Sequence, residues 1–408
     1  MLIDCSRMCP MKLLYISGYK FLETTDGVFA TPSYGDSFWQ KYLEVFDEIT
    51  VLGEPVSFQG DLTKLSKICD KRIKVIILPP NSKPLELKND FAVRKKLKEA
   101  IIDSEAILIK QASRKGNMAI KYAKVFNKPY MIEVTGDMNL DYRTSNSILR
   151  KIYRPFLYKR VKKAIRDCKF GLYVTDTYLQ RVYPISGETL GCTDAVIKNI
   201  DDAVLEKRTQ KIKSMPDDKK IIIGMVASYE NNRKGIDTAI FALSKLKNKS
   251  IELHVLGNGK EKEKEKWMLL AQKNQVNKML YFDQPLSSAE RVFTWIDSID
   301  LMILPSRSEG LPRCIIEAMS RGCPCVTSNV CGLSELIDSD FSHEPNDATA
   351  LAMLISYLIS NKDVLLAQAK KNFEKSRLYQ YENISKKRKA FLLSFKEYAS
   401  GFLKKDKE

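Results

Sequence analysis

Short, almost continuous aliphatic runs alternate with longer amphipathic segments along most of this chain, and they form two successive series. A strand with aliphatic side chains at nearly every position suits a parallel sheet that helices cover on both faces. The expected strands are KLLYIS (12–17), EITVL (48–52), KVIIL (74–78), EAILI (105–109), YMIEV (130–134) and FGLYV (170–174), then IIIGMVA (221–227), IELHVLG (251–257), KMLYF (278–282), DLMIL (300–304) and CPCVTS (323–328). Helices are expected at 37–46, 90–102, 117–126 and 148–167, and then at 235–246, 261–274, 289–298 and 312–321. The pattern predicts two doubly wound α/β domains.

The length of 408 residues also suits two domains, and two domains imply a cleft between them. Residues 1–10 are interpreted as a disordered extension, because the first expected strand follows Met11 directly. We place a Rossmann-like acceptor-binding domain at 11–200 and a Rossmann-like donor-binding domain at 220–380. The polar segment 201–219, which contains Pro216, is interpreted as a linker. We expect the basic C-terminal helix, 381–408, to pack back on the N-terminal domain.

The composition narrows the class of partner and the compartment. A formal charge of +17 favours acidic partners such as nucleic acid, anionic lipids or phosphorylated small molecules. Nucleic acid is disfavoured, because aromatic residues are not interleaved with basic ones on a strand and no zinc or helix-turn-helix spacing appears. Nine cysteines without a regular framework and the lack of a long apolar run predict a cytoplasmic protein. The two histidines leave few members for a triad or a metal centre.

The segment after DLMIL carries the chemistry, because ligands of open α/β sheets bind at the carboxyl ends of the strands. It reads LPSRSEGLPRCIIEAMSRGCPCVTSNVCGLSELI, residues 304–337. Pro312 stands where a first helical turn begins, so the free amides at Gly310 and Leu311 form a natural seat for a diphosphate. Glu309 and Glu317 can accept hydrogen bonds from vicinal hydroxyls. Two carboxylates around an amide cluster suit a sugar joined to a nucleotide by phosphates, whereas they would repel a bare phosphate.

This segment resembles the signature of family 4 glycosyltransferases, PS…EGxP…EAMxxGxPV…G…E, with Glu309 and Glu317 as its paired glutamates. The resemblance implies a GT-B fold, in which two Rossmann-like domains face a cleft and C-terminal helices follow. It also implies a nucleotide-diphosphate sugar donor, transfer with retention, and no cofactor or catalytic metal. The resemblance implies that Glu309 contacts the transferred sugar and that Glu317 contacts the ribose. It also implies that the segment from Gly310 to Pro312 contacts the sugar phosphates.

The same resemblance extends to three other loops. Lys234-Gly235 matches the Lys-Gly pair at a helix start, where the ammonium neutralises the departing phosphate, and Arg233 stands beside it as a further basic group for the donor. Gly35 occupies a place near the donor phosphates. In IEVTGD (132–137), where many members carry a histidine beside the transferred sugar, this chain offers Thr135 and Asp137. The expected catalytic residues are therefore Glu309, Lys234 and Asp137, and no metal ligand is expected.

The segment 148–169 is strongly basic and has an apolar face, as in helices that lie on anionic membranes. An equally open interpretation is a helix of the N-terminal domain whose basic face is exposed to solvent. Family members that build surface polysaccharides use lipid-linked acceptors, so we expect a glycan or lipid-linked acceptor and attachment at the inner face of the cell membrane. Two alternatives share this architecture: a sugar-nucleotide isomerase or phosphorylase, and a non-catalytic sugar-nucleotide-binding protein.

Overall fold

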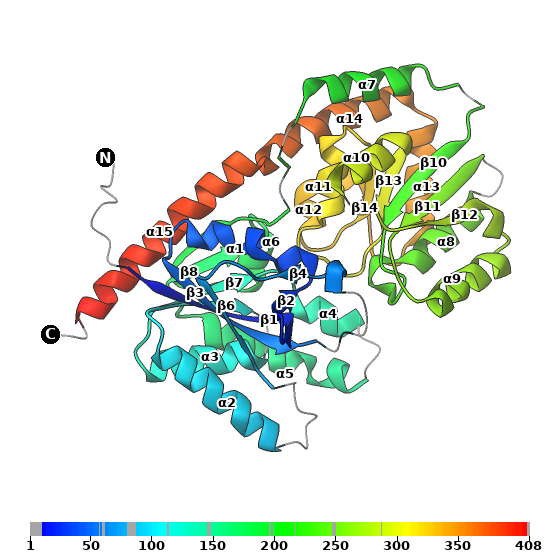
Figure 1. The fold of residues 1–408 in the computed structure, drawn as a ribbon. Helices are drawn as coiled ribbons and strands as arrows, with labels where there is room; N and C mark the ends of the chain where they lie inside the picture. Colours follow the sequence, from blue (N-terminus) through cyan, green and yellow to red (C-terminus); the bar gives the residue numbers. More distant parts are fainter. Residues whose placement is uncertain are drawn as a thin grey trace.

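A computed structural model describes residues 10–405, apart from 57, 59–61, 80–86, 112–113, 145–147, 196, 199, 217, 247–249 and 287. The expected extension at residues 1–10 thus lies outside the described residues except for Pro10. The chain folds into two lobes, each built on its own β-sheet, and a long C-terminal helix runs back along the N-terminal lobe (Figure 1).

The N-terminal sheet has nine strands: β1 Lys12–Thr24, β2 Gly27–Ala30, β3 Glu48–Pro55, β4 Ser66–Lys67, β5 Ile73–Ile77, β6 Ala106–Gln111, β7 Tyr130–Val134, β8 Phe170–Tyr173 and β9 Glu188–Gly191. Its parallel part runs in the order β5-β3-β1-β6-β7-β8-β9. The far end of β1 pairs antiparallel with β2, and β2 pairs antiparallel with β4. The sequence pattern missed this hairpin because it continues the first strand beyond a bulge between Ile16 and Lys20.

Helices cover both faces of this sheet, as the continuous aliphatic strands require. One face packs on α2 Leu87–Ile102, α3 Arg114–Val125 and α5 Ile148–Ile165, through buried residues such as Leu97, Ile120 and Ile165. The other face packs on α1 Asp36–Leu43 and on α15 Tyr381–Lys405. Two short helices, α4 Met138–Thr144 and α6 Tyr178–Val182, follow strands at the carboxyl edge of the sheet.

The C-terminal sheet is parallel throughout, in the order β12-β11-β10-β13-β14-β15. Its strands are β10 Ile221–Val226, β11 Ile251–Leu256, β12 Leu280–Asp283, β13 Leu301–Leu304, β14 Cys325–Ser328 and β15 Ser342–His343. Two buried clusters fill its faces, and they include α8 Ile236–Lys245, α9 Glu261–Lys273, α10 Ala289–Ser298, α11 Arg313–Ser320, α12 Leu333–Leu336, α13 Ala348–Ile359 and α14 Lys362–Ser376. The winding reverses between β10 and β13, and such a switch point opens a crevice at the carboxyl ends of the strands.

The predicted linker at 201–219 is wrong for most of its length, because it forms the helix α7 Asp202–Lys213. The Asp201 side chain caps its first turn by accepting from the Ala203 amide. Arg208 is buried and donates to the carbonyls of Ile296 and Ile299, at 2.8 and 2.7 Å. The linker was predicted because the segment is polar. In the structure the Arg208 guanidinium donates to free carbonyls at the end of α10 and so holds α7 on the C-terminal lobe.

Candidate active site

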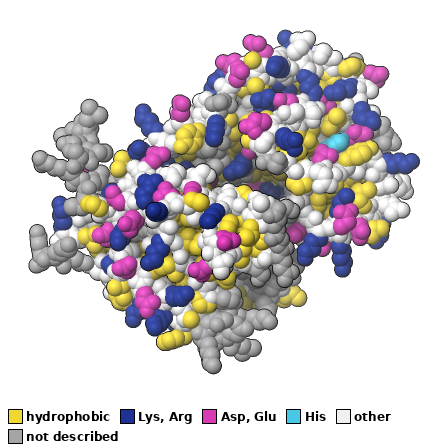
Figure 2. All heavy atoms as spheres, in the orientation of Figure 1, with side chains coloured by type: hydrophobic (Ala, Val, Ile, Leu, Met, Phe, Trp, Pro, Cys, Tyr) yellow, Lys and Arg dark blue, Asp and Glu magenta, His cyan; other side chains and the backbone are white. Residues whose placement is uncertain are grey.

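A cavity of about 340 Å³ lies between the two lobes, at the carboxyl ends of both sheets. Figure 2 shows a hollow between the lobes with basic side chains in it. The N-terminal lobe contributes the end of β6, the turn after β7 and the start of α4, while the C-terminal lobe contributes the turn after β10 and the loop after β13. The cavity is lined by Gln111, Thr135, Gly136, Met138, Asp141, Arg233, Glu309 and Gly310. Its position is the one that the strand order of both sheets indicates for a ligand.

Glu309 and Lys234, two of the expected catalytic residues, are brought together across two loops of the C-terminal lobe. Lys234 Nζ lies 2.6 Å from Glu309 Oε1, and the Ser306 hydroxyl donates to the same oxygen at 2.7 Å. Glu309 is only 6% exposed, so its carboxylate depends on these two donors. Glu309 lines the cavity, with Arg233 as a cation on the same wall, and Lys234 is joined to this wall through its ion pair with Glu309.

The loop geometry explains the Lys234-Gly235 pair. Gly235 has φ +78°, and a Cβ there would lie 2.0 Å from the carbonyl oxygen of Pro305, so only glycine fits this close approach. Arg307 braces the same two loops, because its guanidinium pairs with Asp237 at 2.8 Å and donates to the Asn232 carbonyl at 2.5 Å. These contacts fix Lys234 against the Glu309 loop independently of any ligand.

The segment from Gly310 to Pro312 leads directly into α11, as the diphosphate hypothesis requires. Pro312 is the N-cap of α11 with φ −75°, so free amides point out of the helix start. Glu317 lies one turn further along α11 and is largely buried. This burial raises the pKa of Glu317 to about 7, although the nearby Arg313 opposes the rise. A carboxyl group with such a raised pKa is a candidate functional residue, although Glu317 is not among the described residues that line the cavity.

Of the expected site residues, Glu309, Arg233 and Gly310 line the cavity, whereas six are not among its described lining residues: Lys234, Asp137, Leu311, Pro312, Glu317 and Gly35. Asp137 is only 2% exposed, and its carboxylate accepts from the Tyr183 hydroxyl at 2.8 Å, the Tyr178 hydroxyl at 3.2 Å and the Asn139 amide at 2.9 Å. Three local donors therefore bind its carboxylate, which stabilises the turn after β7. Gly35 is not among the described residues that line the cavity. It is buried beside β4, where an added Cβ would lie 2.7 Å from Ser66 Cβ.

Direct contacts hold the lobes together beside the cavity. The Glu335 carboxylate at α12 accepts from the amides of Asp176, Thr177 and Tyr178 at 2.7, 3.0 and 2.5 Å, and so caps the start of α6 in the other lobe. The Ser308 hydroxyl donates to Asp141 at 2.6 Å. These bonds tie the loop that carries Glu309 to the N-terminal lobe.

Three cavity residues, Gln111, Met138 and Asp141, were missed by the sequence analysis. Gln111 follows the predicted strand EAILI by two residues and ends β6, while Asp141 lies in α4, which was not predicted. A polar residue at the carboxyl end of a strand next to a switch point is the signal that could have identified Gln111.

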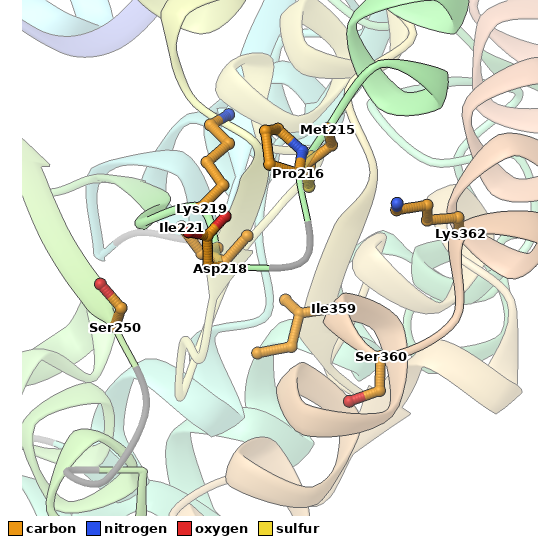
Figure 3. A pocket seen from close by; sticks show the side chains of 9 residues that line it. All are labelled: Met215, Pro216, Asp218, Lys219, Ile221, Ser250, Ile359, Ser360 and Lys362. Carbon is orange, nitrogen blue, oxygen red and sulfur yellow. The ribbon is translucent and has the colours of Figure 1, made fainter.

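A larger cavity of about 640 Å³ lies at the opposite edge of the C-terminal sheet, before β10 and β11 (Figure 3). Lys219, which lines it, is already paired with Asp300 at 2.7 Å. In the described part of the chain, no group of three or more His, Cys, Asp or Glu side chains could hold a metal ion. Over the same residues no single helix has the length and apolar composition to cross a membrane, and α13 with α14 meets that test only as a pair bent by 101°.

Two Rossmann-like lobes that face a cleft at the carboxyl edges of their sheets, followed by C-terminal helices, form the GT-B architecture. Residues 206–376 match the family described as glycosyl transferases group 1, so the C-terminal lobe is a domain of this family. The predicted GT-B fold and the resemblance to this group are thereby confirmed. The narrower assignment to family 4 stays a prediction.

Relatives and solved structures agree with this assignment. The chain is 29% identical over 399 residues to protein CapJ of Staphylococcus aureus, covering 96% of this chain and 97% of that protein. Over 150 residues, 36% of this chain and 40% of the relative, it is 32% identical to the O-antigen biosynthesis glycosyltransferase WclY of Escherichia coli. The fold is similar to a glycosyltransferase of Rickettsia africae (TM-score 0.61, 18% identity, 95% and 98% of the two chains). It is also similar to HepE of Anabaena in complex with UDP-glucose (TM-score 0.63, 15% identity, 94% and 100%).

Proposed function

We propose that this glycosyltransferase moves a sugar from a nucleotide-diphosphate donor to a glycan or lipid-linked acceptor in surface polysaccharide synthesis, with retention and without a catalytic metal. The observation that carries the proposal is the ion pair of Lys234 with Glu309, whose residue lines the cavity together with Gly310 just before the start of α11. The similarity to WclY, an O-antigen biosynthesis glycosyltransferase, supports the pathway, and the similarity to HepE in complex with UDP-glucose supports the donor class.

The proposed reaction assigns one task to each group. The amides of Gly310 and Leu311 bind the diphosphate, while Glu317 accepts from the ribose and Glu309 from the transferred sugar. The bond between the anomeric carbon and the β-phosphate oxygen breaks, a bond to the acceptor oxygen forms on the same face, and the acceptor proton leaves with the diphosphate. Lys234 and Arg233 stabilise the negative charge that develops on the diphosphate, because preorganised cations act most strongly where charge appears.

Attachment to an anionic membrane is the second part of the proposal, and the surface of α5 supports it. Val161 and Ile165 of this helix are buried in the N-terminal lobe, whereas its first half exposes Ile148, Ile152, Tyr153 and Phe156 by 58 to 73%. Lys159, Arg160 and Lys163 are exposed beside them. Apolar side chains next to cations match the interface of a bilayer with anionic lipids, and we place the protein at the cytoplasmic face on this ground.

The test is a thermal-shift screen with UDP-, GDP-, ADP- and dTDP-sugars, followed by a transfer assay on wild type and Glu309→Ala. A ligand that binds the folded state raises the melting temperature by mass action. Glu309→Ala should abolish transfer and keep the fold, since its carboxylate lies at the cavity wall. Near-normal turnover of this variant would show that the donor site is assigned wrongly. Donor binding without transfer to any acceptor, or interconversion of the sugar, would favour the non-catalytic or the isomerase alternative.

A further inference from the structure

Gln111 occupies the N-terminal wall of the cavity, in the lobe that faces the Glu309 loop. It is the last residue of β6, and the winding of the N-terminal sheet reverses between β1 and β6. Side chains at such a switch point face the ligand crevice of an open α/β sheet. Gln111 therefore lies where the N-terminal lobe would contact a ligand that Glu309 of the C-terminal lobe binds.

The amide group of Gln111 is buried and unpaired. The residue is 4% exposed, and neither Nε2 nor Oε1 has a hydrogen-bond partner. Gln368, which is equally buried, offers a contrast, because its amide bonds the Cys325 backbone in both directions at 3.0 and 2.8 Å. Leaving a buried amide unpaired costs about 1–3 kcal/mol, so a fold keeps such a group where a ligand completes its bonds.

Two neighbouring carboxylates are engaged, Asp137 close to the cavity in sequence and Asp141 on its wall. Asp137 accepts from two tyrosines and an amide, and Asp141 accepts from Ser308 of the other lobe. Gln111 thus brings to the cavity one donor group and one acceptor group without partners. A phosphate could use only the donor, because its oxygens accept and do not donate. Vicinal hydroxyl groups satisfy both, since each hydroxyl donates and accepts.

We propose that Gln111 binds hydroxyl groups of the transferred sugar and takes the sugar contact that Asp137, tied to Tyr178 and Tyr183, does not make. The proposal rests on the nucleotide-sugar donor of the proposed function. It makes Gln111 the residue through which the N-terminal lobe distinguishes a sugar nucleotide from a free nucleotide, and one sugar configuration from another.

The test measures the affinities of UDP, GDP, UDP-glucose, UDP-galactose, UDP-N-acetylglucosamine and GDP-mannose by titration calorimetry on full-length wild type and Gln111→Met. Methionine keeps the length of the side chain and removes both hydrogen-bonding groups. The affinity for the preferred sugar nucleotide should fall about tenfold, as expected for the loss of hydrogen bonds to a neutral amide, while the affinity for the free nucleotide stays unchanged. The urea midpoint of the ligand-free variant should not decrease, because no bond within the protein is lost.

Gln368→Met is the matched control, because it removes a buried amide that is fully paired within the protein. It should lower the urea midpoint and leave the preference for the sugar nucleotide unchanged. Three results for Gln111→Met would overturn the role of Gln111 alone. They are an unchanged ratio between the affinities for the sugar nucleotide and the free nucleotide, an equal loss of affinity for both ligands, or a change confined to the KM of the acceptor. A wild-type protein that binds no sugar nucleotide more tightly than its free nucleotide would overturn both this role and the proposed donor.

Discussion

Replacing Glu317 by glutamine should make the stability of the protein less sensitive to pH. Burial raises the pKa of Glu317 to about 7 from its ordinary value of 4.5, and this difference corresponds to about 3 kcal/mol between the two protonation states. The pKa is raised in the folded state, so the folded protein keeps a proton that the unfolded chain has already released. The stabilisation is complete below pH 4.5 and is lost as the pH rises to about 7.

Wild type should therefore lose about 3 kcal/mol of stability relative to Glu317→Gln as the pH rises from 4 to 8. Urea unfolding followed by tryptophan fluorescence at several pH values measures this difference, since Trp267 and Trp295 belong to the same lobe. Glu265→Gln, an exposed position on α9, is the control and should follow the wild-type profile. Parallel profiles for wild type and Glu317→Gln would refute the reasoning.

The same carboxyl group should also couple nucleotide binding to pH. If the ribose hydroxyls donate to the ionised form of Glu317, then binding requires the loss of a proton below pH 7. The affinity for a nucleoside diphosphate should rise from pH 6 to pH 8 in wild type, by up to about tenfold for each pH unit below 7. Glu317→Gln should bind more weakly at pH 8 and show no such slope. An unchanged affinity for the free nucleotide would contradict the ribose contact.

Three further changes test the rest of the site. Lys234→Ala should reduce kcat by on the order of 100-fold or more in a transfer assay, since it removes a fixed cation from the departing diphosphate; a loss of only a few-fold would assign this task to Arg233. Glu335→Ala should separate the lobes and increase the radius of gyration measured by X-ray scattering. Glu335→Gln keeps an acceptor and should not increase it. An equal radius of gyration for Glu335→Ala and wild type would contradict the interdomain role of Glu335. Sedimentation with anionic liposomes should be strong at low salt and nearly vanish at high salt or after charge reversal on α5, at Lys159, Arg160 and Lys163. Charge reversal of Lys262 and Lys266 on α9 is the control, and equal binding to neutral liposomes would exclude an electrostatic mode.

The extent of agreement between sequence and structure differs by element. Tyr130–Val134 and Ala289–Ser298 form a strand and a helix with the predicted bounds, because a continuous aliphatic run and an amphipathic period are local signals. The resemblance assigned Glu309 and Lys234 to one donor site, and only the structure shows that the two residues form an ion pair. The linker prediction failed at α7, where a charged surface pattern concealed the buried Arg208.

The sequence by itself determined the two α/β lobes, the loop that carries Glu309 and the group of transferases to which the C-terminal lobe belongs. These follow from periodicity and from a motif whose residues are close in the chain. The tertiary structure alone decided which side chains of the N-terminal lobe face the cavity. Asp137 and Gln111 both follow predicted strands, yet the Asp137 carboxylate is bound by Tyr178 and Tyr183 whereas the Gln111 amide has no partner. The availability of a polar group depends on its neighbours in space, and the spacing along the chain does not specify them.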